Sequence, residues 1–585
     1  MTRLKSFSFS IIALFFCFSA TAQRGFVSGK IIDSNTGEAL ASATITTPTS
    51  SGGGYSNLEG VFNASFAVGT HNIEIKLMGY DTSIIANVVV LADSTTYIDV
   101  VKLSTASAEE AVKGGVLIII KRKTDSDAAI LADMKNSVNL QDGTGSKEMS
   151  KVGAGNAAAA AQRVTGVSID GGKYVFVRGL GDRYTKTVLN SMELPGLDPD
   201  RNTVQMDIFP TNLIDNIKVL KSFTPNLAGD FTGGWVDVKT KDFQAREIFE
   251  VSASLGFNPA MNLTGDYLSY QKSTADVFAL GAGSRKLPFA EERIAASLWA
   301  TNGEKAQDLV ESFDKTMSPE RKTSLLNSSF SLSYGNQKDT NGRTFGYNLA
   351  MGYSNSYTYY DQAIYETYLK NLDATVNELT LATQNNGSVG ENEVLWSALA
   401  NGSKKKGKHS FTTTLFHTQN GINKSSLLNF ENINNPFGDA GARLDKGILY
   451  YNQRRLTSLL LRHTYGDVDT SWKITSSLSP SLSSNNEPDM RITALSPDEN
   501  GYRFNVGAGS EVSRIYRRLD EIGVNAKVDF ERSFKLKNDS KTKVLFGAAN
   551  NLKSRQFGVV KYTFQAPTYA GMDFSGDPSQ IFEEF

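Results

Sequence analysis

The chain has 585 residues, 60 basic and 61 acidic side chains and a formal net charge of −1. This balance gives no electrostatic reason to expect nucleic acid as a partner, and none is predicted. Its only cysteine, Cys17, lies in an apolar N-terminal segment. The rest of the chain therefore has no residues for a disulfide, a thiolate metal site or a cysteine nucleophile.

The N-terminus has the pattern of a secretory signal peptide, which we place at residues 1–22. Arg3 and Lys5 precede an apolar run at residues 11–18, and an Ala-Thr-Ala sequence at 20–22 supplies a cleavage site. The alternative, an N-terminal membrane anchor, would need about 20 apolar residues, more than this run provides. Cys17 follows two phenylalanines rather than small residues, so lipidation is not expected. The signal predicts export beyond the inner membrane.

Residues 23–103 alternate in short strands broken by turn residues, which predicts a small β-sandwich. The sequences GKIIDSNTGEALASATI from Gly29, NLEGVF from Asn57 and MGY from Met78 resemble the carboxypeptidase regulatory-like domain at the front of Bacteroidetes receptors. The resemblance implies a packing and docking module without catalytic residues.

Residues 104–124 are predicted to be a linker that ends in the aliphatic sequence VLIIIKRKT. Two interpretations stay open. The run is either one more buried strand of the following domain or an extended segment that adds to the edge of a partner's sheet. In the second case the contact residues are Val116, Leu117, Ile118, Ile119 and Ile120.

Residues 146–163 have a helical pattern. The glycines and alanines at 153–158 match a dinucleotide fingerprint loosely, but the polar residues 147–151 stand where that motif needs a buried strand. We therefore expect no nucleotide site, and the alanines are predicted to let a helix pack closely.

The most specific pattern combines YVFVRGLGDRY from Tyr174, IDNIKVLKS from Ile214 and GGWVDVKTK from Gly233. These elements, in this order, resemble the plug domain of TonB-dependent outer-membrane receptors, which we place at residues 125–242. Ser191 and Ser222 stand where the family usually has glycine, and Thr165 where it usually has proline.

The resemblance gives residues of the plug expected structural and gating roles. Arg178 and Arg183 either form ion pairs with carboxylates of the barrel wall or are exposed turn residues. Gly179 is expected to serve the backbone conformation of the turn, and Gly233 and Gly234 the close approach of the last plug strand to the wall. The full set of expected plug residues is Arg178, Gly179, Arg183, Lys221, Gly233 and Gly234. A loop with Pro195, Asp198, Asp200 and Arg201 is predicted to face the ligand.

After Lys241 the chain alternates apolar and polar residues over long stretches, as the strands of a transmembrane barrel require. Turns are predicted at 339–342, 404–407, 466–467 and 538–539, and long polar connections at 258–323, 355–391, 419–450, 481–511 and 553–585. A soluble sandwich or propeller is the alternative, but its strands are usually about five or six residues long. The fold class predicted for the whole chain is mainly β: a β-sandwich, an α+β plug and the first part of an antiparallel barrel at 243–585.

About nine barrel strands are predicted, whereas the barrels of outer-membrane transporters have about 22. The sequence is therefore expected to be an N-terminal fragment of a larger receptor, with a shorter natural barrel as the alternative.

The resemblance implies a cell outer-membrane transporter that imports a scarce or large solute, with the plug and front domain on the periplasmic side. Its implied partners are TonB with ExbB-ExbD, outer-membrane lipid, a small or oligomeric ligand and a surface lipoprotein. Siderophore, glycan, peptide and vitamin all remain open as ligands. An adhesion or assembly protein anchored by its barrel is the alternative function.

A secreted carbohydrate enzyme is a third interpretation, but the sequence has no GxSxG, HExxH or Walker motif to support it. His71, His409, His417 and His463 are scattered without the spacing of metal ligands. No catalytic residue, metal or cofactor is predicted.

Overall fold

The computed structural model describes residues 24–103, 130–563 and 577–579, apart from gaps at 35–36, 48–51, 78–79, 81, 93, 99, 132–133, 136, 138, 182, 202, 243–246, 271–272, 290–307, 341, 374, 434–442, 467–471, 499–500, 505–511 and 536–540. The expected signal peptide and the aliphatic segment 116–124 lie outside the described residues. The chain divides into two compact units, Met1–Ile120 and Lys121–Phe585, and each is described by itself.

The first unit is an all-β domain with an apolar core. Its sheet has the strand order β6-β5-β2-β3-β4-β1-β7, with β8 paired to β1. Alternating residues of the strands, among them Ile31, Phe62, Phe66 and Ile75, are fully or almost fully buried. The strands are β1 (Arg24–Asp33), β2 (Thr44–Thr46), β3 (Gly53–Tyr55), β4 (Val61–Ala67), β5 (Gly69–Lys76), β6 (Ser83–Val90), β7 (Thr95–Tyr97) and β8 (Val101–Leu103).

The second unit begins with a small α+β domain, the plug domain. Its sheet has the order β13-β12-β15-β14-β9, in which β12 and β15 run parallel, and β10 and β11 form a separate hairpin. The three motif sequences form β11, β14 and β15. The elements are β9 (Gln141–Gly145), α3 (Ser146–Lys151), α4 (Ala157–Ala161), β10 (Val167–Asp170), β11 (Tyr174–Val177), β12 (Thr185–Leu189), β13 (Met192–Glu193), η2 (Met206–Ile208), η3 (Thr211–Leu213), β14 (Ile214–Leu220) and β15 (Gly234–Thr240).

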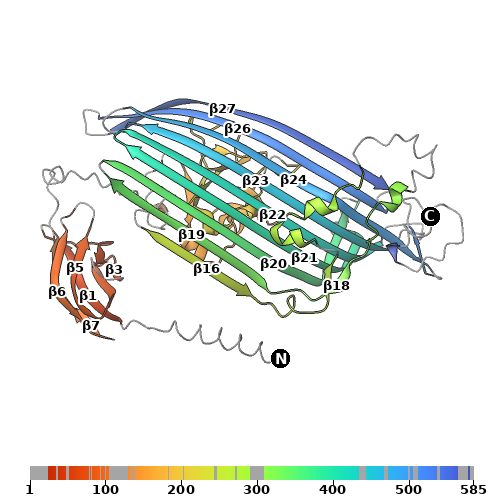
Figure 1. Ribbon diagram of the computed structural model, residues 1–585, viewed down its shortest axis with the longest axis horizontal. Coiled ribbons are helices and arrows are strands. Elements are labelled where there is room, and N and C mark those ends of the chain that lie inside the picture. Colours follow the sequence, from red (N-terminus) through yellow and green to blue (C-terminus); the bar gives the residue numbers. More distant parts are fainter. Residues whose placement is uncertain are drawn as a thin grey trace. The chain divides into compact units, whose positions relative to one another are not determined.

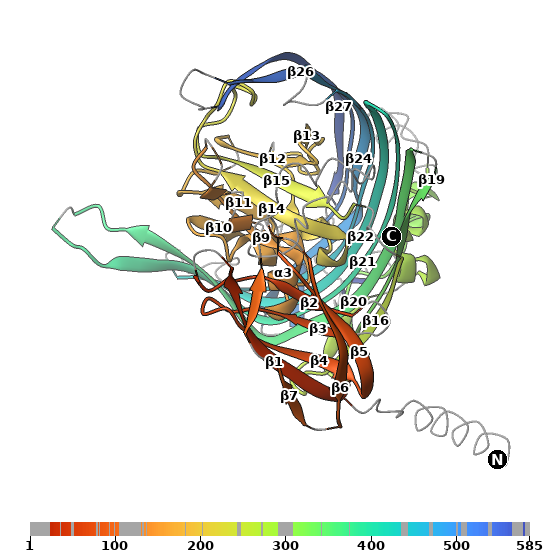
Figure 2. The same ribbon diagram turned by 90° about the vertical axis from the view of Figure 1, so that its left-hand side faces the viewer.

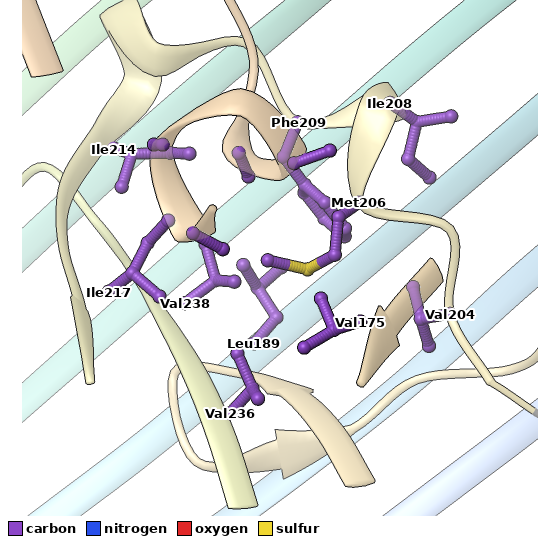
Figure 3. Packing of buried hydrophobic residues seen from close by; sticks show 14 of the residues in the cluster. Val175, Leu189, Val204, Met206, Ile208, Phe209, Ile214, Ile217, Val236 and Val238 are labelled. Atoms are coloured by element: carbon purple, nitrogen blue, oxygen red, sulfur yellow. The ribbon is translucent and has the colours of Figure 1, made fainter. Parts of the chain in front are cut away.

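The helical pattern at 146–163 forms two short helices rather than one. Gly153 has φ +66°, which breaks the first helix, and Asn156 caps the second by accepting a hydrogen bond from the Ala159 amide at 3.0 Å. Four alanines of α4, Ala157, Ala158, Ala160 and Ala161, are buried in the apolar core of the plug, so this helix packs closely as expected. Figure 3 shows this core, in which Val175, Leu189, Ile217 and Val238 converge on Met206.

The largest part of the second unit is an antiparallel sheet of ten strands, here called the wall. Its strands are ordered β16-β19-β20-β21-β22-β23-β24-β26-β27, with β25 paired to β24. The wall is strongly curved, and the plug domain lies on its concave side (Figures 1 and 2). The strands are β16 (Ile248–Gly256), β19 (Asn327–Thr340), β20 (Arg343–Lys370), β21 (Leu379–Lys406), β22 (His409–Asn432), β23 (Arg443–Tyr465), β24 (Lys473–Asp498), β25 (Gly501–Phe504), β26 (Ser513–Lys535) and β27 (Lys541–Thr563).

The mainly β fold class is confirmed, but the predicted extent of the connections was wrong. The stretch 355–391 was expected to be a loop, yet β20 continues to Lys370 and β21 begins at Leu379. About 9–11 residues suffice to cross a bilayer, whereas β20 and β21 have 28 residues each. The hydrogen-bonded ladder continues where the apolar alternation stops, so a pattern based on hydropathy misses these extensions.

The connection between β16 and β19 also differs from the expected external loop. We call its described residues, 257–270, 273–289 and 308–326, the outer strap. It contains β17 (Tyr267–Ser269), η4 (Thr274–Phe278), η5 (Gly281–Arg285) and β18 (Glu320–Lys322). Its yellow-green coils lie across the wall from the plug, on the convex side (Figure 2).

Among the described helices, none combines the length and the apolar character needed to cross a membrane.

Candidate functional site at the plug–wall interface

The Arg-Gly sequence at the end of β11 forms a tight turn within the plug. Arg178 and Gly179 have φ angles of +54° and +75°, and Val177 and Leu180 exchange two backbone hydrogen bonds of 3.0 Å across them. Positive φ at both central residues defines a type I′ turn. Gly179 therefore serves the backbone conformation of this turn.

The side chain of Arg178 bonds within the plug and not to the wall. Its Nη1 donates to the Lys221 carbonyl at 3.2 Å. Lys221 in turn binds the Asp142 carboxylate and donates to the Thr165 carbonyl at 2.6 Å. Arg178 and Lys221 thus join four segments of the plug to one another.

The expected ion pairs between Arg178 or Arg183 and wall carboxylates do not occur among the described residues. Arg183 is exposed in the turn before β12. For both arginines, the structure favours the alternative of turn residues.

Gly233 and Gly234 allow close packing inside the plug, where the sequence suggested an approach to the wall. A Cβ atom on Gly233 would lie 2.9 Å from Leu180 Cβ and Thr185 Oγ1, and one on Gly234 would lie 2.7 Å from Val177 Cγ1. Such distances require neighbouring atoms to move. The two glycines therefore let β15 pass directly behind the Arg-Gly turn.

A buried guanidinium joins the wall to the plug. Arg454, on β23, binds the Asp207 carboxylate of the plug with two hydrogen bonds, of 2.7 Å from Nη2 to Oδ2 and 3.1 Å from Nη1 to Oδ1. Its Nε and Nη2 also donate to Asn420 Oδ1 at 2.9 and 2.6 Å, and Nη1 donates to Gln205 of the plug. The side chains of Arg454 and Asp207 are 1% and 8% exposed, so the pair is almost completely removed from water.

Hydrogen bonds extend this network toward the loop at 194–201. Gln205 donates to the Tyr174 hydroxyl at 2.8 Å, and that hydroxyl donates to the Asp198 carboxylate. Burial, followed by the hydrogen bond to Asp198, raises the pKa of Tyr174 above its ordinary value. The hydroxyl is therefore a stable donor that links the loop to the buried Arg454 pair.

Two more ion pairs have the same polarity as the buried one. Asp200 of the plug lies 3.1 Å from Arg517 of β26, and Glu193 lies 3.4 Å from Lys553 of β27. In all three pairs the plug supplies the carboxylate and the wall the cation, opposite to the expected arrangement. A longer contact of 3.9 Å between Lys241 and Glu250 has the reverse polarity where the plug continues into β16.

The loop predicted to face the ligand is held against the wall at one end. Pro195 is buried, and the neighbouring carbonyls of Gly196 and Leu197 accept hydrogen bonds from Ser483 at 3.0 Å and Asn485 at 2.8 Å. Asp200 is 76% exposed. The exposed part of this loop is therefore its acidic end and not its proline.

Arg201 is fixed by two contacts at that end of the loop. Its Nη1 donates to Asp170 Oδ2 at 2.7 Å, and its guanidinium lies 4.3 Å from the centre of the Tyr174 ring. Asp198, Asp200 and Arg201 are brought together by the structure, whereas Val116–Ile120 fall outside the described residues.

Sequence reasoning missed Arg454, Asp207 and Arg517. The only available signal was a charged residue in a strand of otherwise alternating character. Arg454 and Asp207 are 247 residues apart, and nothing in either local sequence identifies the other as its partner.

Among the described residues, no group of three or more His, Cys, Asp and Glu side chains is arranged to hold a metal ion. The interface instead consists of hydrogen bonds, ion pairs and apolar contacts such as the stacked rings of Phe209 and Phe416, whose centres are 5.7 Å apart. All of these contacts between plug and wall are noncovalent.

Two family models match the sequence. Residues 133–235 match the TonB-dependent Receptor Plug Domain, and residues 27–112 match the CarboxypepD_reg-like domain. The chain therefore carries both domains, as the motifs predicted. No curated protein matches the sequence.

Several solved structures align with parts of the chain at low identity. A cohesin–X-dockerin complex from Acetivibrio cellulolyticus is 24% identical over 14% of this chain, with a TM-score of 0.12, and the match covers 56% of that chain. The pyoverdine outer-membrane receptor FpvA of Pseudomonas aeruginosa is 10% identical over 74% of this chain, with a TM-score of 0.34. The outer-membrane transporter YddB of Escherichia coli is 11% identical over 72%, with a TM-score of 0.27. The chain spans 59% of the length of FpvA and 56% of that of YddB.

Proposed function

We propose that this protein is a TonB-dependent outer-membrane receptor that imports a scarce or large solute with energy transmitted from the inner membrane. The observation that carries the proposal is a TonB-dependent receptor plug domain on the concave face of a curved antiparallel wall (Figure 2). Receptor plugs and regulatory-like domains support transport rather than catalysis.

The convex face of the wall supports a membrane location. Residues 345–353 of β20 present Phe345, Leu349 and Met351 outward, and these side chains are 51%, 52% and 44% exposed. Their neighbour on β22, Leu415, is 44% exposed on the same face. We call this surface the apolar belt. Its height on β20 agrees with the 9–11 or so residues that a tilted strand needs to cross a bilayer.

The lengths of the connections support a proposed orientation of the wall in the membrane. Short turns join β19 to β20 and β21 to β22, and they lie at the end of the wall where the plug continues into β16. The last residues of β21 at this end are Lys404, Lys405 and Lys406. Barrels of this class have short turns on the periplasmic side and longer connections outside. We infer that the exposed acidic end of the plug loop, at Asp200, faces the external medium, where a ligand would bind.

The mechanism we propose moves the plug by breaking contacts with the wall. TonB, with ExbB-ExbD, would bind the segment 116–120 as an added strand and pull on it. Each neutral hydrogen bond contributes about 1 kcal/mol, and each charge that crosses 100 mV supplies about 2.3 kcal/mol. A few charges would therefore suffice to release several plug–wall contacts.

The proposal is tested with the purified periplasmic domain of TonB. The full chain is expected to bind that domain, and deletion of residues 116–124 is expected to abolish binding. Deletion of residues 104–112 is the matched control, since it removes the same length of the linker upstream. Equal binding by both deletion variants would contradict the proposed energy coupling and favour a barrel-anchored adhesion or assembly protein. If deletion of residues 116–124 alone abolishes binding, a growth screen on defined nutrients with the gene disrupted would identify the solute.

A further inference from the structure

The outer strap is attached to the wall along one row of neighbouring residues. Tyr353, Trp396 and Gln419 lie directly opposite one another on β20, β21 and β22. Their side chains donate to the consecutive carbonyls of Val277, Phe278 and Ala279 at 3.0, 2.8 and 2.6 Å. The strap backbone therefore crosses these three strands on the convex face in a defined position.

The wall is shaped to receive this segment. A Cβ on Gly421 would lie 2.9 Å from the Cα and Cβ of Ala279, and one on Gly390 would lie 2.2 Å from the Leu268 carbonyl oxygen. Glycine at these two positions allows the strap to lie directly on the sheet. Farther along, Ala282 donates its amide hydrogen to Gln453 Oε1 at 3.0 Å, which extends the attachment to β23.

The burial of side chains changes along β22 at the point where the strap begins to cover the strand. Phe411 and Leu415 are exposed and alternate with more buried residues, whereas every residue from Thr418 to Asn423 is buried. The plug covers one face of this stretch, since Thr418 donates to the Ile208 carbonyl at 2.8 Å, and the strap covers the other through Gln419. The strap therefore starts where the apolar belt ends.

Three apolar side chains of the strap itself are exposed. Val277, Phe278 and Leu280 are 52%, 59% and 49% exposed. The attachment row lies two residues along the strands from Met351, Ala398 and His417, which form the last row of the apolar belt before the strap. The exposed side chains of the strap thus continue the surface that we assign to lipid.

Two charges that flank this segment, Asp276 and Arg285, neutralise each other. Arg285 donates to both oxygens of the Asp276 carboxylate at 2.8 Å each, and the two side chains are 6% and 8% exposed. The guanidinium also lies 4.2 Å from the centre of the Tyr451 ring. These two charges therefore compensate each other beside the apolar side chains, which suits the boundary of a bilayer.

We propose that Val277, Phe278 and Leu280 insert into the outer leaflet of the membrane at the level of the lipid headgroups, so that the outer strap anchors the wall at its external edge. Tryptophan and tyrosine usually occupy this level and direct their polar groups toward headgroups and water. Here Trp396 and Tyr353 direct theirs to the strap backbone, and the strap side chains take their place at the lipid. This inference rests on the membrane location in the proposed function.

The test measures the environment of spin labels in the full chain, reconstituted in phosphatidylethanolamine–phosphatidylglycerol vesicles. Labels are attached to F278C, to L349C in the apolar belt and to K322C in β18 of the strap, where Lys322 is 52% exposed. The collision rate with oxygen, divided by that with a nickel chelate, is expected to be several-fold higher at 278 than at 322 and to approach the value at 349. V277C repeats the measurement at a second exposed position.

Other results would overturn the inference in distinguishable ways. An aqueous ratio at 278 with a lipid ratio at 349 would remove the anchor but leave the wall in the membrane. Shielding of 278 from both reagents would show that a protein, such as a second copy or a lipoprotein, covers the strap. Aqueous ratios at both 278 and 349 would contradict the membrane location itself and with it the proposed function.

Discussion

Ser191 occupies a backbone conformation that favours glycine, and its side chain compensates for that choice. Its φ is +68°, after Asn190 at +52°. The Ser191 amide and hydroxyl donate to the two oxygens of Asp237 at 2.9 and 2.7 Å. A glycine, usual here in plug domains, would relieve the backbone but lose the hydroxyl bond. The departure from the family pattern is therefore a local exchange of strain for hydrogen bonding.

Lys173 gives a prediction at the residue scale. Burial, followed by the positive charge of Arg454, lowers the pKa of its ammonium group in the folded plug. Between that lowered pKa and the ordinary value of about 10.4, the unfolded chain binds more protons than the folded one. The free energy of unfolding should therefore rise with pH across this window.

We expect Lys173→Met to remove this part of the pH dependence and to stabilise the plug at neutral pH. The measurement is the urea midpoint of the detergent-solubilised chain, followed by tryptophan fluorescence at pH values from about 7 to 10. Lys151→Met is the matched control, because Lys151 is 68% exposed at the end of α3. Parallel pH profiles for wild type and Lys173→Met would contradict the assignment.

At the scale of elements, the hairpins are the best-predicted part of the fold. The turn expected at 339–342 joins Thr340 to Arg343. The turn expected at 404–407 is shorter than predicted, because Lys404–Lys406 belong to β21, and it joins Lys406 to His409 with Gly407 at φ +55°. Turn chemistry and alternation act over a few residues, so the local sequence contains them. The strand extensions to Lys370 and from Leu379 were missed because their polar side chains lack the alternation.

The glycines of β15 give a prediction for this scale. Gly234→Ala should destabilise the plug by about 1–3 kcal/mol, because its Cβ would lie 2.7 Å from Val177 Cγ1 in a packed core. Hydrogen exchange of peptides that cover β14 and β15 would report the faster opening. Gly402→Ala in β21 is the control, since its Cβ meets no atom within 4 Å. Equal protection in the two variants would show that the close approach of β15 to Val177 is unimportant.

At the scale of the whole molecule, the plug is held by contacts that connect distant parts of the chain. The sequence predicted a plug and a wall, but it did not predict the ion pairs that join them: only one of the two open interpretations of Arg178 and Arg183 placed ion pairs there, with the cation on the plug. The reason is physical: Asp207 and Arg454 are 247 positions apart in the sequence and meet only in the folded chain. The docking of the outer strap was missed for the same reason, since Gly281 and Tyr451 are 170 residues apart.

The buried pair of Arg454 and Asp207 allows the free energy that holds the plug to the wall to be measured. Arg454→Met leaves the Asp207 carboxylate buried without its cation and should weaken plug docking by about 3–5 kcal/mol. The double variant Arg454→Met/Asp207→Asn should recover much of that loss, because the unpaired charge is gone. Denaturant titrations of the wild type, the two single variants and the double variant give the coupling energy as a double-mutant cycle. Additive effects would show that the pair does not hold the plug.

Two adjacent residues of β23 bind different partners on the two faces of the wall. Arg454 binds the plug on one side, and Gln453 accepts the amide hydrogen of Ala282 from the strap on the other. A shift of β23 by a single residue would exchange the two faces, placing the guanidinium outside and the amide inside. Neither the plug nor the outer strap could then form its contact with β23. A wall with β23 mispaired by one residue would therefore lose its contacts with the plug and with the strap at the same time, and this double loss would identify it.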